Sequence, residues 1–180
     1  MTADDAVAAV VTVLIITVIV VAIKVVLRPE SLSLSVVGGV VSSTPQPAAN
    51  IVHLGVKLRA ENPSGRARMY FFNITAYLFD NKTVAAATAD PEEDCRILFT
   101  PDDVAVAQQM AVVSVSDVQG KDDPAVMDHF HFDMLYTKRQ VITDVAMRVE
   151  GRLVTEVRSG INRTSQLVTY LCWPLVVGGS

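Results

Sequence analysis

Clustered positive charge is the first thing this sequence lacks. Charged residues make up 19% of the 180 residues, the formal net charge is −4, and no segment gathers Lys and Arg into a patch. Proteins that bind nucleic acid need such a patch, because basic side chains neutralise the phosphates. We therefore expect no nucleic-acid partner.

Catalytic signatures are absent as well. The sequence contains no Gly-rich phosphate loop, no Gly-x-Ser-x-Gly turn, no His-Glu-x-x-His helix and no Cys-x-x-Cys pair. Each of these motifs places a nucleophile, a metal or a phosphate cradle at the spacing that its chemistry requires. We therefore expect a protein that is not an enzyme and that uses no cofactor.

Long apolar runs are missing too, with one exception. The 22 residues from Ala6 to Leu27 include only three that are not apolar, Thr12, Thr17 and Lys24. They account for the raised mean hydropathy of +0.38, and the remainder has the composition of an ordinary globular domain. This distribution excludes a disordered chain, a collagen-like repeat and a multi-span transporter. One apolar segment and one domain remain.

The apolar segment predicts a membrane anchor. Ala6–Ile23 is a run of 18 uncharged residues, and a helix of about 20 such residues crosses a hydrocarbon core of roughly 30 Å. A cleaved signal peptide and a buried core helix are the alternatives. The leader carries Asp4 and Asp5 in place of basic residues, and a segment that is apolar all round suits lipid. We predict an uncleaved transmembrane helix at residues 6–27, after a short tail at residues 1–5.

Two signals conflict about the orientation of this helix. Lys24 and Arg28 follow the span, which favours a cytosolic C-terminal domain. Three glycosylation sequons, which begin at Asn73, Asn81 and Asn162, favour the exterior. We give the sequons more weight. We expect a single-pass membrane protein with a glycosylated domain outside the cytosol.

The rest of the chain alternates apolar and polar residues, which is the pattern of half-buried strands. The clearest strand places five apolar side chains on one face: Val52, Leu54, Val56, Leu58 and Ala60. We assign residues 28–50 to a first strand and a linker, with a Ser/Pro-rich loop over 42–50. Residues 51–180 form the domain, to which the strand at residues 31–41 also belongs.

The alternation recurs often enough to predict an all-β fold. Between Met69 and Phe79 we expect one aliphatic row: Phe72, Ile74, Ala76 and Leu78. Further strands are expected at residues 83–89 after a hairpin turn at 80–82, and at 96–100, 141–149 and 166–177. Residues 104–115 fit a helix or a strand. Seven or more short strands without a strongly amphipathic helix indicate an antiparallel β-sandwich.

Two histidines stand among aromatic residues between Met127 and Leu135. If this segment is extended, His129, His131 and Asp133 share one face, at a spacing that suits a divalent metal. The alternative is a solvated polar row behind a buried apolar row. Because the pattern fixes no further ligand from elsewhere in the chain, we assign no metal site and keep these three residues as candidates.

Cys95 and Cys172 are the only cysteines. In an oxidising compartment they could form a disulfide; two unpaired thiols are the alternative. The acidic residues beside Cys95 raise the pKa of a thiol, so we expect no nucleophilic role for it.

The order of several short motifs resembles a plant family. The apolar span is followed by Leu27-Arg28-Pro29, by a strand that ends in Asn62-Pro63, by a Tyr-rich strand over 70–80, and by a closing strand around Cys172-Trp173-Pro174. This order is similar to the late embryogenesis abundant subgroup-two proteins. Their membrane-anchored members are called harpin-induced-like or non-race-specific-disease-resistance-like and share a water stress and hypersensitive response domain. The longer basic cytosolic tail of that family is missing here.

The resemblance implies an immunoglobulin- or fibronectin-like sandwich on a single-pass anchor, with Asn62 and Pro63 as the family's turn. It also implies a location at the plasma membrane and a non-enzymatic role in plant defence or abiotic stress. We expect a membrane-anchored interaction or signalling module whose partners are the lipid bilayer, through the N-terminal helix, and an unknown protein. The alternative is a physical stress protectant or lipid-associating domain without a specific protein partner.

Overall fold

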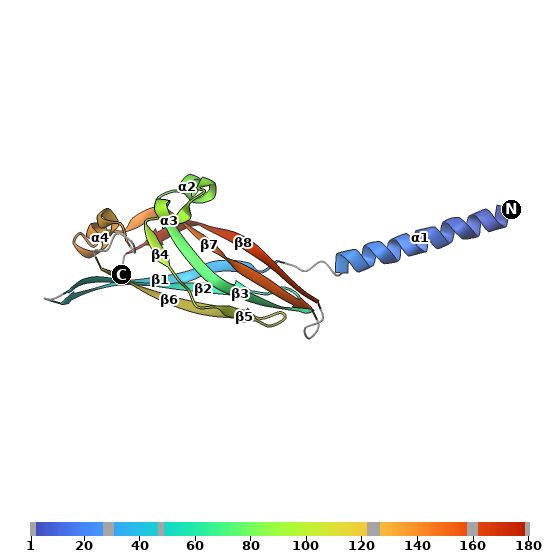
Figure 1. Ribbon diagram of the computed structural model, residues 1–180, viewed down its shortest axis with the longest axis horizontal. Coiled ribbons are helices and arrows are strands. Elements are labelled where there is room, and N and C mark those ends of the chain that lie inside the picture. Colours follow the sequence, from blue (N-terminus) through green and yellow to red (C-terminus); the bar gives the residue numbers. More distant parts are fainter. Residues whose placement is uncertain (1–2, 27–30, 47–48, 122–126, 158–161, 179–180) are drawn as a thin grey trace. The chain divides into compact units, whose positions relative to one another are not determined.

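A computed structural model describes residues 3–26, 31–46, 49–121, 127–157 and 162–178 (Figure 1). Side chains are described for residues 10–21, 31–39, 52–115, 127–157 and 163–178. The chain divides into two compact units, Met1–Glu30 and Ser31–Ser180. Each unit is treated by itself below.

The first unit contains one helix, α1 (Ala3–Val26), of 24 residues. Its described side chains, at residues 10–21, are all exposed, and the large apolar ones among them are 46–64% exposed. Among the described residues, no helix is both long enough and apolar enough to cross a membrane. The predicted helix is therefore confirmed, whereas its membrane crossing is not.

The second unit is built from two antiparallel sheets, which Figure 1 shows as two layers. One sheet has the order β1-β2-β6 and the other the order β4-β3-β7-β8, with β5 paired to β3. The strands are β1 (Ser33–Gln46), β2 (Ala49–Glu61), β3 (Ala67–Phe79), β4 (Ile97–Phe99), β5 (Val104–Val106), β6 (Ala111–Lys121), β7 (Ile142–Val157) and β8 (Asn162–Val177). The predicted sandwich-like arrangement of antiparallel strands is confirmed.

The apolar row predicted for β2 lies in the core. Val52, Leu54, Leu58 and Ala60 are at most 3% exposed. The predicted linker is wrong for residues 42–46 and 49–50, because β1 stays paired with β2 from Ser33↔Glu61 to Gln46↔Ala49; residues 47–48 lie outside the described ones. Proline has no N–H to donate, so sheets accept it mainly in edge strands, where its nitrogen can face away from the neighbouring strand. β1 is an edge strand, which explains why Pro45 is tolerated there.

The predicted aliphatic row of β3 changes phase at a bulge. The pairing of β3 with β7 shifts between Phe72 and Thr75, where Asn73 has a φ of 51°. Asn is one of the few residues that visit this left-handed region readily. Phe71, 1% exposed, therefore takes the core position that the alternation gave to Phe72, while Ile74 and the residues after it keep their predicted face.

The predicted strand at residues 83–89 is a helix. α2 (Lys82–Ala87) begins at Asn81, whose side-chain oxygen accepts a hydrogen bond from the Val84 N–H at 3.0 Å. The alanine run after Val84 suits a helix, and a short-side-chain cap stabilises its first turn. Ala85 packs with Tyr77 and other residues of a small second cluster. α3 (Pro91–Asp94) follows.

The remaining strands agree with the sequence pattern. β4, β7 and β8 lie within or around their predicted ranges, and residues 104–115 contain β5 and the start of β6 in place of a helix. The main core lies between the sheets, and its largest fully buried side chains include Phe71, Met69, Ile97, Met147 and Leu153.

Candidate functional site

The segment with the two histidines is a helix, so the predicted extended conformation is wrong. α4 spans His129–Tyr136. His131 is 4% exposed and Phe132 is 5% exposed, while Phe130 is 59% exposed. Residues 131, 132 and 135 share one side of a helix, and their burial favours the helical period over the strand period. His131 is therefore separated from exposed His129 and does not share a face with it.

His131 is clamped between two carboxylates. Its Nε2 lies 2.8 Å from Oδ1 of Asp80, which directly follows β3, and its Nδ1 lies 3.1 Å from Oδ2 of Asp128. Arg96 donates from Nε to the other oxygen of Asp80 at 2.8 Å, and its carbonyl accepts from the Asp128 N–H at 3.0 Å. The hydrogen bond to Asp80 raises the pKa of Arg96. Both ring nitrogens thus hold structural partners.

This cluster does not form a metal centre in the described part of the chain. No three His, Cys, Asp or Glu side chains converge there in a way that could hold a metal ion. Asp133, the third candidate, pairs with Lys138, whose Nζ lies 2.9 Å from Oδ2. That hydrogen bond lowers the pKa of Asp133. His131, Asp80 and Asp128 therefore tie α4 to the end of β3.

The Asn62-Pro63 turn is held by the asparagine side chain. Asn62 is fully buried, and its Nδ2 donates to the carbonyls of Ala67 at 2.8 Å, Ala107 at 3.1 Å and Val106 at 3.2 Å. Its Oδ1 accepts from the Ser64 N–H at 3.0 Å. A buried amide satisfied on both sides fixes the turn that joins the two sheets. The Asn62-Pro63 motif, which suggested the family, therefore has a structural role in this turn.

The sequon asparagines differ in their surroundings. Asn73 is exposed at the β3 bulge, and its backbone N–H donates to Asp103 at 2.8 Å. Asn81 is exposed and caps α2 through Oδ1, which leaves its Nδ2 outside that hydrogen bond. Asn162 begins β8, and its side chain lies outside the described ones.

Cys95 and Cys172 are both free thiols, so the possible disulfide is not formed in this structure. Sγ of Cys95 donates to the Glu92 carbonyl at 3.4 Å. Burial, and to a lesser degree the charge of Glu92, raises the pKa of the Cys95 thiol. Burial also raises the pKa of Cys172, against a smaller lowering by a backbone hydrogen bond with Val36.

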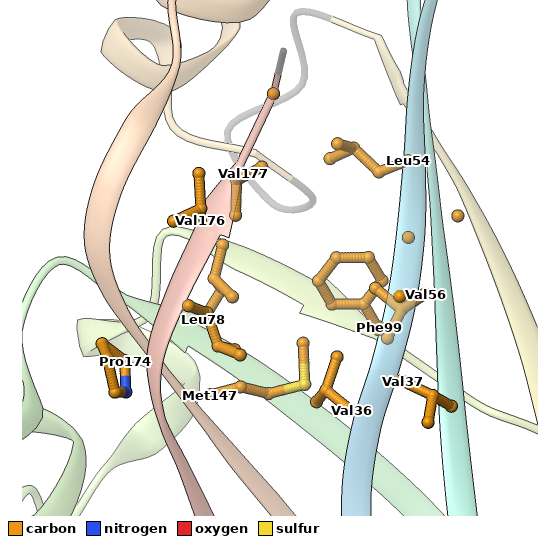
Figure 2. Close-up of a pocket in the computed structure, with 15 residues that line it drawn as sticks. Val36, Val37, Leu54, Val56, Leu78, Phe99, Met147, Pro174, Val176 and Val177 are labelled. Carbon is orange, nitrogen blue, oxygen red and sulfur yellow. The ribbon is translucent and has the colours of Figure 1, made fainter. Parts of the chain in front are cut away.

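A pocket between the sheets was not predicted from the sequence. It has a volume of about 320 Å³ and opens between strands of both layers (Figure 2). Figure 2 shows Met147 and Phe99 of one sheet lying toward Val36 and Val56 of the other. The lining comprises residues 36–39, 54–56 and 174–178 together with Leu78, Phe99 and Met147.

Bulges in two strands account for the pocket. The β1–β2 register passes from Val36↔Leu58 to Gly38↔Lys57 and leaves Val37 unpaired. The β7–β8 register passes from Met147↔Cys172 to Val145↔Leu175, so that two residues of β8, Trp173 and Pro174, stand opposite one residue of β7. β1 and β8 stand at the ends of their sheets' strand orders. Because a bulge bends the strand that carries it, two facing bulges separate the layers locally.

Three glycines, Gly38 and Gly39 of β1 and Gly55 of β2, line the pocket. Gly39 pairs with Val56, and a Cβ at Gly39 would lie 2.6 Å from the Gly55 carbonyl oxygen. A side chain there is excluded, because the backbone of Gly55 already occupies that space. Glycine inside a strand pattern often marks a bulge or a close backbone approach. Gly38, Gly39 and Gly55 were therefore the available sequence signal.

Comparison with known proteins gives a distant structural likeness and no family. No family model matches the sequence, and no curated protein matches it. Among solved structures, a protein from Archaeoglobus fulgidus is similar, with 7% sequence identity and a TM-score of 0.32. The alignment covers 81% of this chain and 98% of that one. These values assign no family, and the resemblance to the late embryogenesis abundant proteins stays a prediction.

Proposed function

We propose that this chain is a membrane-anchored, non-enzymatic β-sandwich that acts as an interaction module. The anchor is α1. Every described side chain of α1 is exposed, and the large apolar ones lie on all sides of the helix. Water penalises such a surface by about 25 cal/mol per Å², and a bilayer removes that penalty. The uncharged sequence extends beyond the described side chains to Ala6 and Ile23.

The domain lies outside the cytosol in this proposal, at the plasma membrane. The support is the three sequons, of which Asn73 and Asn81 are exposed. Expression in a eukaryotic secretory pathway followed by glycosidase digestion tests the orientation. We expect a mobility shift that shrinks when Asn73→Gln and Asn81→Gln are combined. A chain without any shift would place the domain in the cytosol.

The interaction surface is the outer face of β8. It carries four exposed apolar residues, of which Leu167 is 81% exposed and Val176 is 65% exposed, with Leu171 and Trp173 between them. A row of exposed apolar residues on one strand face can form the kind of contiguous patch that marks a contact site. His131, buried and bonded at both nitrogens, favours a structural rather than a catalytic role. The family resemblance suggests plant defence or abiotic stress as the setting.

Flotation with liposomes tests the anchor. We expect the full chain to float with phosphatidylcholine vesicles and to stay bound through an alkaline carbonate wash. The variant Leu14→Asp with Val18→Asp should be released. The matched variant Val113→Asp with Val115→Asp, on exposed positions of β6, should stay bound. A wild-type chain that does not float contradicts the anchor.

Partner capture tests the β8 face. A partner retained by the full chain should be lost with Leu167→Lys and Leu171→Lys together. It should be kept with Val113→Lys and Val115→Lys, which add the same charge to exposed valines of the other sheet. Equal retention by both variants would place the contact elsewhere.

A second candidate function is a lipid-associating domain, and the apolar pocket between the sheets favours it. Pockets of this kind, lined mostly by apolar side chains, are where small molecules bind. This candidate is compatible with the anchor, because an anchored domain stays next to its lipid supply.

A further inference from the structure

We propose that the pocket between β1 and β8 binds one aliphatic chain, from a free fatty acid or from a membrane lipid. The inference rests on the second candidate function and names its ligand. The site involves neither of the clusters that the sequence singled out, because His129, His131, Cys95 and Cys172 do not line it.

The lining selects an uncharged ligand. All the lining residues are aliphatic, aromatic, thioether, glycine or proline residues, so the polar atoms of the walls belong to the backbone. A charged group would lose its hydration there without an ion-pair partner, which is costly. A hydrocarbon loses nothing by leaving water and gains contact with the walls. Met147, a flexible thioether at the inner end, adapts to ligands of varied shape.

The volume suits part of a lipid rather than a solvent molecule. An apolar cavity of about 150 Å³ stays dry and takes up benzene. This pocket, at about 320 Å³, offers roughly twice that space. It is also at the lower end of the range for small-molecule sites, about 300–1,000 Å³. One hydrocarbon chain fits this size, whereas a whole phospholipid does not.

The pocket runs from the core to the surface. Leu54 and Met147 are 2% exposed at its inner end, while Val37 of β1 and Val176 of β8 are 53% and 65% exposed. The mouth therefore lies between the two edge strands. A chain can enter methyl end first and leave its polar head in water. This arrangement explains why the lining needs no polar side chain.

A peptide strand is the competing occupant of this edge, and the bulges disfavour it. Adding a strand to β1 or β8 requires a regular row of backbone donors and acceptors. Val37 interrupts that row in β1, and Trp173-Pro174 interrupts it in β8. Pro174 also lacks an N–H to donate. The free edges thus lack the regular backbone row that an added peptide strand would need.

Photolabelling tests the proposal. The full chain is reconstituted in phosphatidylcholine nanodiscs with one of two probes. The first is a fatty acid with a diazirine at its methyl end, and the second is a phosphatidylcholine with the diazirine on one acyl chain. After illumination, mass spectrometry locates the labelled residues. We expect label on peptides that contain Leu54 or Met147, because these residues lie at the inner end of the pocket, where the methyl end of the chain would sit. The probe that labels them identifies the source of the chain.

Two variants test whether the label reports the pocket. Val56→Phe fills it from β2 and should lower the labelling of these peptides about tenfold, as a loss of about 1.4 kcal/mol in binding would. Val115→Phe adds the same ring on an exposed position of the same sheet and should leave labelling unchanged. If Val56→Phe fails to unfold cooperatively on heating, Val36→Phe replaces it. In the wild type, excess unlabelled fatty acid should suppress the same peptides.

Several results would overturn the proposal. One is label spread over the surface with no excess at the pocket peptides. Another is equal label in Val56→Phe and Val115→Phe, and a third is label that excess unlabelled fatty acid does not reduce. Displacement of the probe by a peptide alone would assign the site to a strand. Failure of the anchor is distinguishable, because it abolishes flotation and the labelling of α1 by the lipid probe but leaves the fatty-acid result at the pocket.

Discussion

Nε2 of His131 lies 2.8 Å from Oδ1 of Asp80, and this contact joins α4 to the end of β3. The ring is buried, while the Asp80 side chain is 48% exposed and keeps Arg96 as a second partner. A buried imidazole that loses its hydrogen-bond partners costs free energy, because its nitrogens are no longer solvated by water. We therefore expect the contacts of His131 with Asp80 and Asp128 to stabilise the fold.

Removal of this ring should destabilise the domain. We expect His131→Ala to lower the free energy of unfolding by about 2–4 kcal/mol, because it opens a cavity and leaves two carboxylates without their shared partner. Urea denaturation followed by circular dichroism measures the change. His129→Ala, on the exposed side of the same helix, should change it by less than about 0.5 kcal/mol. Equal effects would mean that the clamp does not stabilise α4.

The Asn62 turn should depend on a donor that only an amide supplies. Asn62→Asp keeps the shape but replaces Nδ2, which reaches three backbone carbonyls, with a second acceptor. We expect a loss of about 3–5 kcal/mol, since the new carboxylate is buried and unpaired. Thermal unfolding measures it.

Asn81→Asp is the matched control for that substitution. Asn81 is exposed and uses only its acceptor oxygen to cap α2, and Asp caps about as well as Asn. We expect a change below about 0.5 kcal/mol. If both variants lose similar stability, donation by Asn62 is not what holds the turn.

The neighbouring glycines of β1 should respond differently to the same methyl group. A Cβ at Gly39 would lie 2.6 Å from the Gly55 carbonyl oxygen, whereas a Cβ at Gly38 would meet no heavy atom within 4 Å. Gly39→Ala should cost about 1–3 kcal/mol through strain. Gly38→Ala should be neutral or stabilising by up to about 1 kcal/mol, because it lowers the entropy of the unfolded chain. Urea midpoints compare the two, and the reverse order would contradict the backbone path at the bulge.

The two thiols should react slowly until the pH is high. Burial raises the pKa of both Cys95 and Cys172, so the thiolate forms in the folded chain only above the usual thiol range near 8.5. Since the folded pKa is raised, the stability that the neutral thiols contribute is present below the unfolded pKa and is lost as pH rises through the folded pKa. Iodoacetamide labelling between about pH 7 and 10, with mass spectrometry, measures both rates. Labelling of either thiol as fast as in denatured chain at pH 8 would contradict this.

The burial of residues in long alternating segments was predictable, because it follows from the local order of apolar and polar residues. The five apolar residues of the β2 row lie where period two places them, and Val56 alone among them is only half-buried. Asn62-Pro63 likewise carries its own turn chemistry. In the segment after Met127, alternation fits a strand and a helix equally well over so few residues. Contact of Phe132 and Leu135 with the core selects the helix.

By itself, the sequence determined the apolar N-terminal segment, the antiparallel strands and the Asn62 turn, because each depends on residues that are neighbours in the chain. Only the tertiary structure decided the phase change at Asn73, the clamp on His131 and the pocket. The clamp needs Asp80 and His131, and the pocket needs residues 36–39 and 174–178, to meet from distant parts of the chain. Such long-range contacts depend on how the two sheets pack and on where their edge strands bulge. A local sequence pattern does not determine either of these features.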